Sequence, residues 1–279
     1  MVYEPTLTPY IPDETVPLAG AGPTVLVQFF ALAAGTQTVN VYRVSEGRQF
    51  RVRGGVNLYA VGGATVMDYE PPGGTTITYQ AEQFNSAGVS LGFTGTTSTG
   101  LFFTRTYIHQ PLNPLLAVTA NIMLGSADDF SRPSPGSTVW PEGATVGRTI
   151  GGQRRGLTGM PLRVRLPTTA ALDTFGQMFG SYTTNYPSVI CIRNPGPVRI
   201  PRLLFAGCLD PHETIAGVNA LLTFTMAVDE VAPPYPGLII PTLRRADIDA
   251  AFPTRGARAA AYATRGDRDA DFSKAGLAG

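Results

Sequence analysis

The chain has 279 residues, of which 43% are hydrophobic and 15% charged, and its formal net charge is +1. This length supports one large domain or two small ones, and the near-zero net charge provides no overall field that would attract nucleic acid or an anionic membrane. The 32 glycines and 24 prolines follow no fixed period, which excludes collagen and is typical of many strands joined by tight turns.

Residues 1–23 contain five prolines, which exclude a helix and predict an extended N-terminal arm. The arm also carries the apolar side chains of Tyr3, Leu7 and Tyr10. Three placements of this arm are consistent with the sequence: along a neighbouring subunit, across its own domain, or frayed in solution. Because exposing apolar surface is costly, we expect these three side chains to be covered by a neighbouring subunit in an assembled state.

Residues 24–108 show the pattern of an antiparallel β-sandwich. Polar and apolar residues alternate over 49–53 and 76–81, which places one face on a core and the other in water. The Glu-Pro-Pro-Gly-Gly segment at 70–74 predicts a turn, because proline has no N–H to donate to a strand ladder. Leu101-Phe-Phe is a predicted final strand. The pattern favours a sandwich of the immunoglobulin or fibronectin type III kind.

The segment from Asp68-Tyr-Glu-Pro to Tyr79-Gln-Ala, with Val41-Tyr-Arg before it, resembles minor tail proteins of long-tailed phages that infect actinobacteria. The resemblance covers residues 22–110 and is weaker over 111–232. It implies a structural protein of the virion tail tip, synthesised in the host cytoplasm. Its partners would be copies of itself, as a ring or around a central spike, and other tail proteins.

Residues 109–231 predict a second β domain, and the prolines and asparagine in 107–114 predict a boundary before it. Thr168 or Thr169 caps the single expected helix, 168–179, which Gly180 ends. The order of elements resembles the small β-barrel with a flanking helix of phage tail-tube and distal-tail proteins. A second sandwich or a split barrel is therefore expected. Its predicted segments are strands at 115–124, 162–166, 188–193, 198–206 and 220–228, with a long loop at 125–146.

Residues 232–279 return to a proline-rich composition and predict an extended C-terminal arm. Short helices are expected near 243–251 and 257–262, and neither is long enough to be stable alone. Its apolar side chains are expected to contact neighbouring subunits, namely Leu238, Ile239, Ile240 and Phe252.

The sequence shows no arrangement typical of an enzyme, a metal site or a cofactor site. Asp210, His212 and Glu213 combine a base with acids, but all three fall in one predicted turn and do not converge from separate elements. Asp267, Asp269 and Asp271 have calcium-loop spacing, yet Phe272 stands where the loop requires glycine. The two cysteines, Cys191 and Cys208, lie in apolar runs and are predicted to be buried thiols. No signal peptide or membrane-spanning run is seen, which predicts a soluble protein.

Aromatic and arginine side chains in the second domain are the candidate contact residues. Trp140, Tyr182 and Tyr186 fall in predicted loops, and Arg154 and Arg155 lie in a basic, glycine-rich stretch. Both residue types are enriched at the centres of protein interfaces. The first hypothesis assigns them to contacts between tail subunits. The alternative is a carbohydrate-binding module that uses Trp140 to attach the virion to the host cell wall.

Overall fold

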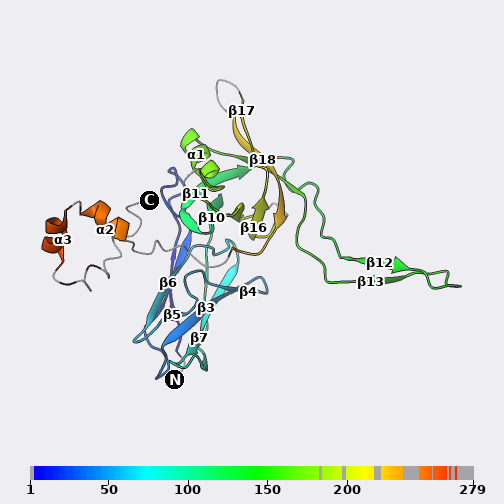
Figure 1. Cartoon of the computed structure of the whole chain (residues 1–279). Coiled ribbons are helices and arrows are strands. Elements are labelled where there is room, and N and C mark those ends of the chain that lie inside the picture. The colour runs from blue at the N-terminus through cyan, green and yellow to red at the C-terminus, as the bar shows by residue number, and fades with distance from the viewer. Residues whose placement is uncertain are drawn as a thin grey trace. The chain divides into compact units, whose positions relative to one another are not determined.

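The computed structural model describes residues 3–181, 184–196, 199–216, 221–234, 245–252, 254–262, 264 and 268. The chain divides into two compact units, Met1–Gly237 and Leu238–Gly279. With 43% of residues in strands and 9% in helices, the protein is mainly β, as the sequence predicts. The first unit holds two lobes, a two-sheet lobe and a barrel (Figure 1).

The two-sheet lobe contains the strands that the alternating pattern predicts. One sheet has the order β1-β2-β6, and the other has β4-β3-β7-β8, with β5 pairing with β3 and β9 with β7. Burial alternates along β3 and β7, so one face of each strand lines the core. The strands are β1 (Thr6–Tyr10), β2 (Thr24–Phe29), β3 (Thr38–Ser45), β4 (Arg48–Arg51), β5 (Leu58–Tyr59), β6 (Ala64–Asp68), β7 (Thr76–Phe84), β8 (Ser90–Phe93) and β9 (Thr97–Gly100).

Turn chemistry fixes the connections in this lobe. Glu46 and Gly47 both have positive φ, 49° and 71°, as a two-residue hairpin between β3 and β4 requires. The predicted turn at 70–74 lies between β6 and β7 and is confirmed. The strand predicted at Leu101-Phe-Phe is wrong, because β9 ends at Gly100. Leu101 and Phe103 instead bury their side chains in the core from an irregular segment.

The N-terminal segment is an integral part of the two-sheet lobe. β1 pairs antiparallel with β2, and Leu7 packs against the core. The Glu14 carboxylate then accepts hydrogen bonds from the backbone N–H groups of Thr104 and Arg105. The predicted boundary at residue 23 therefore does not separate an arm from the domain. Proline is tolerated here because β1 is an edge strand, where one row of N–H groups needs no partner.

The second lobe is a closed six-stranded antiparallel barrel. Its strands follow the order β14-β11-β10-β15-β16-β18, and a further pairing of β14 with β18 closes the ring. β17 adds to β18 outside this ring. The strands are β10 (Thr106–Gln110), β11 (Asn113–Ile122), β14 (Met160–Arg165), β15 (Val189–Arg193), β16 (Leu203–Cys208), β17 (His212–Ala216) and β18 (Leu221–Glu230).

Two predictions for the barrel region are corrected by these strands. The boundary predicted from 107–114 lies earlier in the chain, because β10 begins at Thr106 with all five residues buried and Pro114 lies inside β11. His212 and Glu213 do not lie in a turn with Asp210, because β17 begins at His212. In both places long-range pairing outweighs the local turn signal.

A single helix, α1 (Thr169–Gln177), covers the barrel core as predicted. The Thr168 side chain accepts a hydrogen bond from the Ala171 N–H and caps its first turn. Phe175 is fully buried, and its ring lies 4.6 Å from that of Phe224 in β18. The apolar face of α1 therefore completes the hydrophobic core of the barrel.

The predicted long loop at 125–146 contains a two-stranded ribbon instead. β12 (Gly136–Val139) pairs antiparallel with β13 (Arg148–Gly151), and no other strand in the described part of the chain joins them. All residues from 131 to 156 are exposed except the partly exposed Gly147. We call residues 131–156 the ribbon (Figure 1).

The second unit contains two short helices where the sequence predicts them, α2 (Arg245–Ala251) and α3 (Arg255–Ala261). The rings of Phe252 and Tyr262 pack edge to face at 5.4 Å, and Arg258 pairs with Asp249. Leu238, Ile239 and Ile240 lie outside the described residues. No helix in the described ranges is long and apolar enough to cross a membrane.

We predict that Phe175→Ala lowers the free energy of unfolding by about 3–5 kcal/mol, because it opens a cavity where α1 meets the barrel. Urea denaturation followed by circular dichroism measures this change. The matched control is Phe30→Ala, which removes an aromatic ring that is 70% exposed and should change stability by less than about 0.5 kcal/mol. Equal effects of the two substitutions would contradict the role of α1 in the core.

Candidate functional site

The two lobes meet where the two-sheet lobe covers one wall of the barrel. On β15 and β16, Ile190, Ile192 and Leu204 point into the barrel core, whereas Cys191 and Phe205 point outward. These outward residues form a small cluster with Leu203 and pack against Phe50 of the two-sheet lobe. Both faces of these strands are therefore buried, which explains their continuous apolar sequence.

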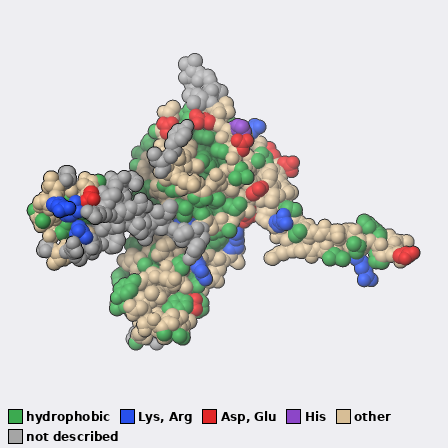
Figure 2. Space-filling view, in the orientation of Figure 1, with side chains coloured by type: hydrophobic (Ala, Val, Ile, Leu, Met, Phe, Trp, Pro, Cys, Tyr) green, Lys and Arg blue, Asp and Glu red, His purple; other side chains and the backbone are tan. Residues whose placement is uncertain are grey.

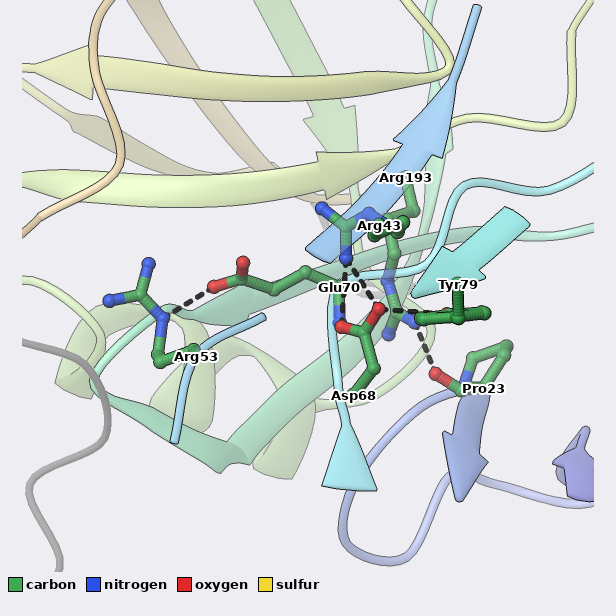
Figure 3. A network of polar contacts seen from close by, with 7 residues as sticks. All are labelled: Pro23, Arg43, Arg53, Asp68, Glu70, Tyr79 and Arg193. Atoms are coloured by element: carbon green, nitrogen blue, oxygen red, sulfur yellow. Dashed lines mark hydrogen bonds and ion pairs between the residues drawn. The ribbon is translucent and has the colours of Figure 1, made fainter. Parts of the chain in front are cut away.

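Beside this apolar contact lies a buried ionic network (Figure 3). Arg43 of β3 and Asp68 of β6 come from opposite sheets and are 0% and 1% exposed, with Nη1 2.7 Å from Oδ2. Tyr79 of β7 donates its hydroxyl to the same carboxylate at 2.8 Å. Burial has the largest single effect and disfavours the charged Arg43, but Asp68, Tyr79 and Glu70 together outweigh it and raise the guanidinium pKa. The pair links the two sheets at the end of the core that faces the barrel.

A second ion pair extends the network. The Arg53 Nε lies 2.6 Å from the Glu70 Oε1, and Arg53 also donates to the backbone carbonyl of Pro234. Burial raises the Glu70 pKa, and the charge of Arg53 offsets only part of that effect. Because Pro234 follows the last barrel strand, this arginine connects the chain leaving the barrel to the two-sheet lobe.

The third arginine belongs to the barrel. Arg193 of β15 donates to the carbonyl oxygen of Pro23, and its guanidinium lies 5.7 Å from the centre of the Tyr107 ring. A Cβ at Gly22 would fall 2.4 Å from Arg193 Nη2, so this approach requires glycine. Three arginines thus face two carboxylates, and the backbone carbonyls of Pro23 and Pro234 accept hydrogen bonds from two of the arginines.

His109 is buried next to this excess of positive charge. It lies on β10, is 1% exposed, and neither ring nitrogen has a hydrogen-bond partner among the described residues. Burial lowers its pKa well below the usual range, and the charges of Arg193, Arg53 and Arg43 lower it further. His109 is therefore neutral in the folded protein at physiological pH.

The two cysteines are free, buried thiols, as predicted. Burial raises the pKa of Cys191 and raises that of Cys208 to about 12. Cys191 faces outward toward the other lobe, and Cys208 belongs to the barrel core. Neither has the lowered pKa of a reactive thiolate.

The ionic network is built from residues that carry the sequence resemblance. Asp68, Glu70 and Tyr79 belong to the Asp-Tyr-Glu-Pro and Tyr-Gln-Ala motifs, and Arg43 ends the preceding Val-Tyr-Arg run. The sequence analysis did not identify them as contact residues. One signal in the sequence could have identified the network. Arg43 follows Val39 and Val41 at an inward position of the strand, and a charged residue at a core position needs a partner.

The predicted contact residues do not form one site. Trp140, Arg154 and Arg155 are all exposed on the ribbon. Tyr186 instead accepts a hydrogen bond from the side chain of Asn113, at the start of β11. Tyr182 lies outside the described residues. The sequence assigned Trp140 to a loop and the two arginines to a separate basic stretch, and only the strand pairing of the ribbon brings them onto one segment.

The predicted arm residues also have separate environments. The backbone carbonyl of Tyr3 accepts a hydrogen bond from Gly95, and Leu7 packs on its own domain. These two contacts are internal rather than intersubunit. Tyr10 is 59% exposed, so its coverage by a neighbouring subunit stays a prediction. The same holds for Phe252, whose ring contacts Tyr262.

The acid–histidine group is on the surface. His212 Nε2 lies 3.1 Å from Asp210 Oδ2, and both side chains are largely exposed. No group of three or more histidine, cysteine or acidic residues in the described ranges is arranged to hold a metal ion.

The chain matches no protein-family model, and comparisons with curated proteins and with solved structures find no match.

We predict that Asp68→Asn destabilises the protein by about 3–5 kcal/mol, because it leaves the buried Arg43 without a counter-charge. Chemical denaturation at neutral pH measures the loss. Arg48→Gln is the control, since it breaks an exposed ion pair with Glu230 and should cost less than about 1 kcal/mol. If the two substitutions cost the same, the buried pair does not hold the sheets together.

We also predict that His109 makes the protein less stable in mild acid. The unfolded chain binds a proton at the ordinary histidine pKa, whereas the folded chain does not, so stability falls as the pH drops below about 6.5. Between pH 7 and 5.5 this one group should remove about 1 kcal/mol.

His109→Phe keeps an aromatic ring and removes the titration. Denaturation of the wild type and of this variant at the two pH values isolates the contribution of His109. The contributions of all other titrating groups, including Glu70, cancel in the difference between the two proteins. Glu70 acts in the opposite sense, because its raised pKa favours the folded state as the pH falls toward 4.5. A phenylalanine variant with unchanged acid sensitivity would exclude His109 as the cause.

Proposed function

We propose that this protein is a structural component of the tail tip of a long-tailed phage that infects actinobacteria, a minor tail protein. In this proposal it assembles through contacts with copies of itself and with other tail proteins. The sequence resemblance over residues 22–110 suggests the family. The observation that carries the assembly role is the ribbon.

The ribbon has no core of its own. A two-stranded hairpin in water is at best marginally stable, and residues 131–156 are all exposed except the partly exposed Gly147. Val139, Ile150 and Trp140 are nevertheless exposed, the last two at 65% each. Figure 2 shows hydrophobic side chains gathered over the outer part of this segment. Such a surface is expected to be covered by a partner.

The ribbon presents two different faces to that partner. Val139 is paired with Arg148, and Ser137 with Ile150, so one face combines two apolar side chains with a serine and an arginine. On the other face the Thr138 and Thr149 hydroxyls lie 3.1 Å apart, and the Trp140 ring lies over Gly147. Aromatic and arginine side chains are suited to protein interfaces, which favours a protein partner for this segment.

The architecture is compatible with the same proposal. We infer that the two-sheet lobe is an immunoglobulin or fibronectin type III-like sandwich. We also infer that the barrel with α1 is related to tail-tube and distal-tail domains. Support for the first comes from two packed antiparallel sheets, and for the second from the closed barrel with one covering helix. Fold likeness alone does not determine function, so the assembly test is decisive.

The alternative function is attachment to the host cell wall through Trp140. The observation in its favour is that the Trp140 indole is 65% exposed on the ribbon. Retention of the purified chain on host cell walls, lost in Trp140→Ala, would support this alternative. No retention of the wild type would exclude it.

The test of assembly is the triple substitution Val139→Ser, Trp140→Ser and Ile150→Ser. Stability should change by less than about 1 kcal/mol, because none of the three side chains is in a core. Complementation of a phage lacking the gene should nevertheless fail, with the variant absent from purified virions. Immunogold labelling of wild-type particles should place the chain at the tail tip.

The matched control is Phe30→Ser, Val61→Ser and Val89→Ser, which removes three equally exposed apolar side chains from the two-sheet lobe. This control should be incorporated normally. Labelling anywhere other than the tail would contradict the proposed function. Normal incorporation of the ribbon variant would remove the ribbon from the assembly role.

A further inference from the structure

A shallow hollow of about 310 Å³ lies on the two-sheet lobe, far along the sequence from the ribbon. It is lined by the turn before β7, by β7 and by β9. The lining residues are Gly74, Thr75, Thr76, Ser98, Thr99, Gly100 and Phe102. Four of them carry hydroxyls, one is aromatic, and none is charged.

The local pairing explains why a hollow forms here. Thr76 of β7 is paired with Gly100 of β9, so the surface position opposite Thr76 has no side chain. The Phe102 ring borders this gap, with its Cε2 atom 3.2 Å from the position that a Gly100 Cβ would occupy. Phe102 is 78% exposed, so most of the ring is free for contact with a ligand.

The hydroxyls around the gap are available. Ser98 and Thr78 bond to each other at 2.8 Å, whereas the side chains of Thr75 and Thr76 make no hydrogen bond within the described part of the chain. Thr99 is paired with the buried Ile77 and lies on the opposite face of the sheet. Each hydroxyl can both donate and accept. The hollow therefore offers a flat apolar ring beside two unused hydroxyl groups.

The charged groups near the hollow limit the class of ligand that it can bind. Arg202 contacts Gly74, but its guanidinium is already bound to the carbonyls of Gly73 and Pro195 and to Glu46. No free charge is thus left to pair with a phosphate or carboxylate. A ligand that matches the hollow is neutral, rich in hydroxyls and apolar on one face.

We propose that this hollow binds a pyranose unit of a neutral saccharide. The C–H face of the sugar ring would stack on Phe102, and its hydroxyls would bond to Thr75 and Thr76. Aromatic rings with a few placed polar groups are the usual composition of small-molecule sites. The proposal does not depend on tail assembly or on Trp140, because every group involved lies within one lobe.

The test uses the full chain with neutral methyl glycosides of glucose, galactose, mannose and N-acetylglucosamine. Saturation-transfer NMR detects binding at millimolar affinity, and titration gives the dissociation constant. At least one glycoside should bind the wild type. Phe102→Ala should weaken that binding about tenfold or more, as expected for loss of an aromatic stacking contact.

Gly100→Ala provides an independent variant, because the added methyl group projects into the hollow against the Phe102 ring while its backbone conformation suits alanine. It should also abolish binding, with an unchanged denaturation curve. Phe93→Ala is the matched control, since it removes another exposed ring from the same sheet outside the hollow. It should retain full affinity.

Three outcomes would overturn the proposal: no glycoside binds, binding survives Phe102→Ala, or Phe93→Ala reduces it equally. Binding lost only in Trp140→Ala would place saccharide recognition on the ribbon instead. Because the assay needs no assembly, its failure is separate from failure of the tail-tip proposal.

Discussion

The buried pair between Arg43 and Asp68 is the constraint on which the arrangement of the first unit depends. Each of these residues belongs to a different sheet, and each would carry an uncompensated buried charge without the other. The same end of the core receives Arg193 from the barrel and Arg53 beside the chain that leaves it. Ionic groups restrict geometry more than apolar contacts do, because a charge tolerates only a partner at hydrogen-bond distance. The network therefore specifies how barrel and two-sheet lobe meet, whereas the cluster around Phe205 supplies the apolar burial.

The remainder of the first unit divides into a rigid part and an exposed part. The barrel, α1 and the two-sheet lobe bury their apolar residues in continuous cores. The ribbon keeps its apolar residues in water and leaves both of its strand edges unpaired within the described chain. A segment that cannot be stabilised by its own chain gains stability by binding, which is why it carries the proposed assembly role. The hollow beside Phe102 differs from the ribbon, because its shape is fixed by strand pairing before any ligand arrives. Assembly and saccharide binding are thus assigned to physically separate surfaces.

Local patterns in the sequence were sufficient for several elements. Alternation over 49–53 and 76–81 predicted strands that the structure contains, and the Pro-Pro-Gly-Gly turn delivered β7 in the expected place. The threonine cap and Gly180 bounded α1 within two residues. These features depend on residues close together in the chain, so their physical causes are visible in a short window of sequence. Of the candidate contact residues, Trp140, Arg154 and Arg155 share one exposed segment, which no pattern in the sequence predicted.

The tertiary structure decided what depends on partners distant in sequence. Proline density in 1–23 predicted a separate arm, yet β2 offered an edge to which β1 could pair. The prolines and asparagine in 107–114 predicted a domain boundary, yet β10 begins at Thr106 and the barrel buries it on both faces. His109 is uncharged because the barrel buries it and, to a lesser degree, because of the charges of three arginines from other elements. The hollow forms where Gly100 falls opposite Thr76. By itself the sequence determined the mainly β class, the turns and the helix. The register between distant strands decided the closure of the barrel, the ionic network and the position of every candidate site. Packing of both sheet faces sets that register, and no local pattern encodes it.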